Sequence, residues 1–115
     1  MKGILINPFD QTIKEVVYTG DFREVYVLIE CQTFDCVNID YKNTLYVDDE
    51  GLLKENRYFS WNDRNFAGKA LILGSDYETG SDKETTLTID EVSKIVEWLP
   101  EGHRETPYME FKAWS

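Results

Sequence analysis

Basic side chains are scarce in this chain. Twelve lysines and arginines face 22 aspartates and glutamates, which gives a formal net charge of −10. Because each contact with a phosphate needs a Lys or Arg side chain, direct binding to nucleic acid is disfavoured, and so is binding to an anionic membrane surface. The charge favours the opposite kind of partner, a basic protein.

The residues that build metal and catalytic centres are also few. His103 is the single histidine, which excludes a metal cluster built from several histidines. The sequence has no G-x-S-x-G motif, no P-loop and no G-x-G-x-x-G motif. We therefore predict a protein that is not an enzyme and that needs no cofactor.

Long apolar runs and paired cysteines are absent as well. No apolar stretch approaches the ~20 residues that span a bilayer, and no signal-like segment precedes the first strand-like run. Cys31 and Cys36 do not form a C-x-x-C pair, and we expect both to be small apolar side chains near the core. These features predict a cytoplasmic protein with two reduced thiols.

The apolar content is nonetheless that of a folded domain. Of the 115 residues, 42% are hydrophobic and 14% are aromatic, so the condition for disorder, low hydrophobicity beside high charge, fails. The length is typical of one domain, and aromatic side chains favour a β-rich or mixed fold.

Short apolar or β-branched runs between turn residues predict the strands. They lie at residues 3–6, 12–18, 34–39, 44–47, 58–61 and 70–74. The first pair and the 34–39 and 44–47 pair are close enough to form hairpins. The 70–74 run is the most apolar of the second half and is predicted to be central. Residues 62–65 are expected to form a loop, and residues 75–84 a mobile surface loop.

Two capping signals predict short helices. Asp21 with Glu24 resembles a capping box at the start of a helix over residues 21–30. Thr88 with Glu91 predicts a second helix, whose apolar stripe runs to Leu99 before Pro100 ends it.

The order of these elements predicts the α+β class, with a mainly antiparallel sheet and two short helices on one face. Residues 1–99 form the single domain. The aromatic C-terminal tail, residues 100–115, is expected to dock on the body as an edge strand or to pair with a second copy, so the protein is a monomer or a homodimer.

Several segments together resemble a known family, the domain-of-unknown-function family 3846 of phages, prophages and other mobile elements. The best-matching segment is Leu45–Leu53. Weaker matches are Ile4–Pro8, the helix start at Asp21, Cys31–Val37, Ala67–Gly74 and Leu87–Leu99. The tail from Pro100 onward lies outside the pattern, and the loop between Trp61 and Phe66 departs from it. The resemblance implies a phage or mobile-element origin and no particular chemistry.

The acidic turn Asp48-Asp49-Glu50 is one candidate site. Carboxylates converging on a turn suit Mg²⁺ or Ca²⁺, which would allow a carboxylate-metal enzyme, although the run lacks the spacing of an EF-hand. The alternative is a solvated turn in which an Asp bonds to the backbone and Gly51 adopts a positive φ. We favour this alternative and predict no metal.

An aromatic and basic cluster at residues 57–64 is the second candidate. Tyr58, Phe59 and Trp61 would stack on a nucleotide, and Arg57 and Arg64 would pair with its phosphates. The alternative is an ordinary aromatic strand that packs in the core, with solvated arginines.

The acidic surface as a whole is the third candidate. Dispersed carboxylates on a rigid scaffold can occupy the basic groove of a nucleic-acid-binding host enzyme, where phosphates would otherwise lie. The alternative is that the charge only keeps the protein soluble. We predict an electrostatic binder that modulates a host protein, with the nucleotide-binding module as the alternative.

Overall fold

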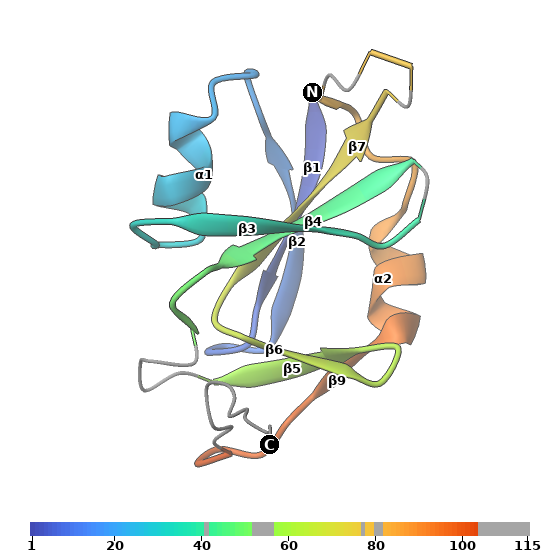
Figure 1. Cartoon of the computed structure of the whole chain (residues 1–115). Helices are drawn as coiled ribbons and strands as arrows, with labels where there is room; N and C mark the ends of the chain where they lie inside the picture. The colour runs from blue at the N-terminus through green and yellow to red at the C-terminus, as the bar shows by residue number, and fades with distance from the viewer. Residues whose placement is uncertain (41, 52–56, 77, 80–81, 104–115) are drawn as a thin grey trace, which may run out of the picture.

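Strand β7 (Ala70–Ser75) lies at the centre of the larger of two antiparallel sheets (Figure 1). The computed structural model describes residues 1–40, 42–51, 57–76, 78–79 and 82–103. Residues 70 to 74 are all buried. Strand β7 pairs with β1 (Lys2–Asn7) on one side and with β4 (Asn43–Asp48) on the other. The predicted central strand and the predicted α+β class are both confirmed.

Two hairpins flank β7. Strand β1 pairs with β2 (Thr12–Val17), and β4 pairs with β3 (Phe34–Asn38), which gives the strand order β2-β1-β7-β4-β3. Both hairpins were expected from the turn residues between the strands. Strands distant in sequence are thereby joined, because Ile6 of β1 pairs with Ala70 of β7 and residues 7 to 69 lie between them.

The two helices cover opposite faces of this sheet, so the prediction that both lie on one face is wrong. Helix α1 (Arg23–Leu28) packs on Leu71 and Leu73, whereas α2 (Ile89–Ile95) packs over Ile72. Successive side chains of a strand point to opposite faces. Because β7 is apolar on both faces, each face of the sheet must pack against another element.

The smaller sheet has the order β6-β5-β9 and shares a core with the α2 face. Strand β5 (Tyr58–Trp61) was predicted, but β6 (Arg64–Ala67) replaces much of the expected 62–65 loop. Asn62 and Asp63 alone form the turn, with φ values of 48° and 67°. Two consecutive positive φ values match a type I′ hairpin turn, which these residue types tolerate.

Helix α2 begins as predicted and ends earlier. Thr88 and Glu91 form the capping box, but Val96 is extended, with φ −71° and ψ 133°. Residues Val96–Trp98 form β9 and pair with β5, so the predicted helix to Leu99 is wrong. The side chain of Val96 is buried in β9, and the strand adds ladder hydrogen bonds with β5.

Helix α1 is shorter than predicted, and its predicted capping box is wrong. Phe22 occupies the N-cap position in a helical conformation and makes no side-chain cap. The carboxylate of Asp21 instead accepts hydrogen bonds from Arg23, and that of Glu24 accepts from Thr19 N (3.0 Å) and Oγ1 (2.7 Å). Glu24 therefore stabilises the connection from β2 rather than the helix start.

Part of the predicted 75–84 surface loop is a strand. Asp82–Lys83 form β8, which pairs with the end of β7. Gly74 permits this approach, since a Cβ there would lie 2.1 Å from the carbonyl oxygen of Glu84.

Two further expectations concern the thiols and the tail. Cys31 packs beside the α1 core, but Cys36 is exposed on the edge strand β3, so its expected place near the core is wrong. Strand β3 has a neighbouring strand on one side only, so its side chains are less covered than those of the central strand β7. The aromatic tail from residue 104 onward lies outside the described residues.

Asn43 is a buried polar hub between the β3–β4 turn and the segment before α2. Its side chain is 1% exposed. Its Nδ2 donates to Asp40 and to Thr86 Oγ1 (2.9 Å), and its Oδ1 accepts from Thr85 Oγ1 (2.6 Å) and Thr86 N (3.2 Å). A buried amide with this many partners joins two segments that are about forty residues apart in sequence.

We expect Asn43→Ala to lower the free energy of unfolding by about 1–3 kcal/mol, because Thr85 Oγ1 loses its buried partner. Denaturant unfolding followed by circular dichroism measures this change. Gln32→Ala removes an exposed amide and should change stability by less than about 0.5 kcal/mol. Equal effects of the two substitutions would contradict the role of Asn43.

Candidate functional site

The acidic turn is built by its own backbone contacts. Asp48 Oδ1 accepts a hydrogen bond from Glu50 N at 2.9 Å, and Asp49 N donates to the carbonyl of Thr33 at 3.1 Å. One carboxylate thus bonds to the backbone of the turn as predicted, but the positive φ expected at Gly51 is wrong, since Gly51 is not among the described glycines with a positive φ. Within the described ranges, no group of three or more His, Cys, Asp or Glu side chains is placed to hold a metal ion.

Gly51 brings this turn against β6. A Cβ at this position would lie 2.9 Å from the carbonyl oxygen of Ala67 and 3.1 Å from its Cβ. Only glycine permits such an approach without movement of one backbone. The acidic turn and β6 therefore form two walls of one surface depression.

We call this depression the acidic hollow. It has a volume of about 230 Å³ and lies between the β3–β4 hairpin and β6. Its carboxylates are those of Asp35, Asp48 and Asp49, and its apolar lining includes Val37, Val47 and Phe66. The acidic turn and the 57–64 cluster, which the sequence suggested as separate sites, meet here, because Arg64 also lines the hollow.

Arg64 lies over an aromatic ring of this hollow. Its guanidinium carbon is 5.4 Å from the centre of the Phe66 ring, a cation–π arrangement. The ring of Phe66 in turn packs on that of Phe59 in the core, with centroids 5.6 Å apart. The hollow therefore already holds one guanidinium of its own chain on an apolar surface.

The aromatic members of the 57–64 cluster lie in the core, whereas Arg57 is partly buried. Tyr58 is 1% exposed and Trp61 is 5% exposed. The ring of Tyr58 contacts that of His103 edge-on, and the carbonyl of Arg57 accepts a hydrogen bond from Gly68 N. A nucleotide cannot stack on these rings without opening the core. The geometry thus supports the alternative, an ordinary aromatic core strand, and gives the nucleotide hypothesis no support.

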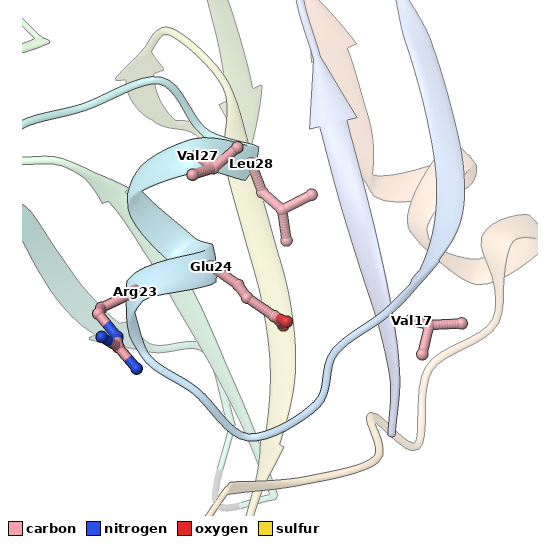
Figure 2. A pocket seen from close by; sticks show the side chains of 5 residues that line it. All are labelled: Val17, Arg23, Glu24, Val27 and Leu28. Carbon is pink, nitrogen blue, oxygen red and sulfur yellow. The ribbon is translucent and has the colours of Figure 1, made fainter.

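A second depression, the helix hollow, lies between α1 and the end of β2 (Figure 2). It has a volume of about 410 Å³, and Val17, Val27 and Leu28 provide its apolar surface. In Figure 2, Leu28 and Glu24 extend from the helix toward β2, whereas Arg23 points away. The sequence patterns did not predict this hollow, and its one signal is Val27, an apolar residue that is 76% exposed.

The comparisons with known proteins place the chain in a family. A family model described as Domain of unknown function (DUF3846) matches residues 1–99. The chain belongs to this family. The resemblance seen in the sequence is thus confirmed, and every helix and strand of the described ranges lies within the matched residues. No curated protein and no solved structure matches the chain.

In the part that the structure describes, no helix is long and apolar enough to cross a bilayer.

The charged groups of the helix hollow are already paired within this DUF3846 protein. Arg23 contacts Asp21 at 2.9 Å, and Glu24 is bonded to Thr19. The side-chain hydrogen bond from Arg23 lowers the pKa of Asp21 below its ordinary value of 3.8. The pKa of Asp76 is also lowered, but by backbone N–H groups of Glu78 and Thr79. The helix hollow consequently offers a partner mainly apolar surface.

We expect Arg23→Gln to raise the pKa of Asp21 toward its ordinary value, because the charged donor is lost. A carboxyl ¹³C NMR titration measures this shift, and Asp76 is an internal control whose pKa should stay lowered. A depressed pKa means that the Asp21 contact stabilises the fold above the ordinary pKa and is lost as pH falls through the lowered value. An unchanged Asp21 titration would contradict the pairing.

Proposed function

We propose that this protein is a non-enzymatic binder that modulates a basic protein through its negative surface. One observation carries the proposal. If every Lys and Arg neutralised one carboxylate, ten of the 22 carboxylates would still lack a basic partner within the chain. Such a surplus attracts basic partners over a distance and raises the rate of encounter.

Three cations of the described residues form ion pairs with carboxylates of the chain. Arg23 pairs with Asp21, Lys69 with Glu30 and Lys94 with Asp90. Both side chains of the last pair and the Arg23 side chain of the first are mostly exposed, so these contacts add little stability. Each pair uses one positive charge locally, so that charge does not neutralise a second carboxylate.

The scaffold suits this role because it holds carboxylates on paired strands. The β3–β4 segment, residues 34–50, contains five carboxylates and a single lysine. Asp35 lies on β3 and Asp48 on β4, and β4 is paired on both sides, which fixes the positions of its side chains. A rigid acidic surface can occupy a basic groove that otherwise binds phosphates.

The family resemblance supports a phage or mobile-element origin, and the partner would then be a protein of the host cytoplasm. A nucleic-acid-binding protein is the class of partner that this chemistry fits best. Nucleic acid itself and anionic membranes would be repelled by the same charge. Cys31 and Cys36 do not form a disulfide, which agrees with a reducing compartment.

We expect the immobilised protein to retain a nucleic-acid-binding protein from bacterial lysate at low salt and to release it at high salt. The physical reason is screening, since the Debye length falls from about 30 Å at 0.01 M salt to about 3 Å at 1 M. Mass spectrometry identifies the retained protein, and its purified form gives the affinity at each salt concentration.

Nucleic acid provides the control for this experiment. Nuclease treatment of the lysate should leave retention intact, and added DNA should compete with the acidic protein for its partner. An affinity that does not weaken as salt rises would overturn the proposal, as would retention of no protein at low salt.

A further inference from the structure

The acidic hollow lies between two open sheet edges. In the described part of the chain, β3 is an edge strand of the larger sheet and β6 an edge strand of the smaller one. Val37 and Val47 project from the larger sheet toward the core that both sheets share, and Phe66 projects from β6. Val37 and Phe66 are only partly buried, so the shared core reaches the surface at this point.

The hollow is lined by apolar side chains, which we call its floor, and by carboxylates, which we call its rim. Asp35, Asp48 and Asp49 line it, and the single lysine of the hairpin, Lys42, lies at the other end of β4. A small metal ion would need convergent ligands, and the carboxylates of the described ranges do not form such a group. A fully apolar ligand would match the apolar surface of the hollow but not its three carboxylates.

A long basic side chain can contact both the apolar surface and the carboxylates of the hollow. The methylene stems of Lys and Arg cover apolar surface while their charged heads stay near water or carboxylates. Arg64 shows this chemistry within the chain, since its guanidinium lies on Phe66. The volume of about 230 Å³ lies below the about 300–1,000 Å³ of pockets that hold whole small molecules, which also favours a side chain.

We propose that the acidic hollow binds an arginine or lysine side chain of the partner protein. This inference rests on the proposed function and names the surface that performs it. The stem of the basic side chain lies on Val37, Val47 and Phe66, and its head pairs with the rim carboxylates. Arg64 competes for the same ring, so it weakens binding and limits it to partners that displace it. A second copy of this acidic chain is repelled and is not the occupant.

A fluorescent peptide of arginine and glycine is the probe, and its anisotropy with the full chain at low salt gives the affinity. We expect the triple variant Asp35→Asn, Asp48→Asn, Asp49→Asn to bind the peptide about tenfold more weakly than the unaltered protein. Asparagine keeps the side-chain oxygen that accepts the turn hydrogen bond of Asp48, so the fold is retained.

The matched control has the same net charge. Glu15→Gln, Glu97→Gln and Glu101→Gln remove three exposed carboxylates away from the hollow, and we expect less than about threefold weakening. Equal weakening by both triples overturns the hollow as the site but leaves the electrostatic binder intact. Absence of any peptide binding at low salt overturns both.

Arg64→Gln tests the same site, and it should change the peptide affinity in the opposite direction. It frees the Phe66 ring and should tighten peptide binding, whereas Lys14→Gln removes one exposed cation elsewhere and should change peptide affinity less.

Backbone NMR of the unaltered protein gives a readout that needs no variant. Added peptide should shift the amides of Val37 and Phe66, and shifts confined to Val17 and Val27 would place the peptide in the helix hollow and overturn the proposal.

Discussion

The pairing of β7 with β1 and β4 is the interaction on which the rest of the structure depends. It joins the first hairpin, the second hairpin and the middle of the chain in one antiparallel ladder. The apolar side chains of β7 then recruit both helices, with Leu71 and Leu73 under α1 and Ile72 under α2. Burial of each such side chain contributes about 1.5–3 kcal/mol.

The acidic hollow is a consequence of that register. Val47 pairs with Ala70, so the end of β4 and the start of β7 lie side by side. The acidic turn follows β4 directly, and β6 precedes β7 by Gly68 and Lys69. Both walls of the hollow are therefore fixed by one pair of strands, and Gly51 lets them approach. Surface carboxylates gain their defined positions from the core.

Sequence patterns predicted the elements whose signal is local. The apolar 70–74 run, both hairpins and the capping box of Thr88 follow from period, turn residues and hydrogen-bonding side chains. The errors lie where tertiary contacts decide. Val96 fits a helical stripe and a strand equally, and pairing with β5 selects the strand. Only the Asn62-Asp63 turn hinted at β6, and β8 had no local signal at all.

The candidate sites also differ in whether a local sequence signal or tertiary contacts define them. The acidic turn was identified from three consecutive carboxylates, and its backbone contact has the predicted form. The aromatic cluster was ambiguous, since a run such as Tyr58 to Trp61 looks alike in a core and in a pocket, and only burial separates them. The acidic hollow was not predictable, because Phe66 reaches the predicted β3–β4 hairpin only through the packing of the smaller sheet on the larger one.

Amide hydrogen exchange of the full chain, with and without its captured partner, tests the central claim most directly. The account predicts added protection in β3, β6 and the acidic turn, and little change in α1 and α2. Protection centred on α1 and the end of β2 would contradict it, because an apolar surface and not the surplus of negative charge would then hold the partner.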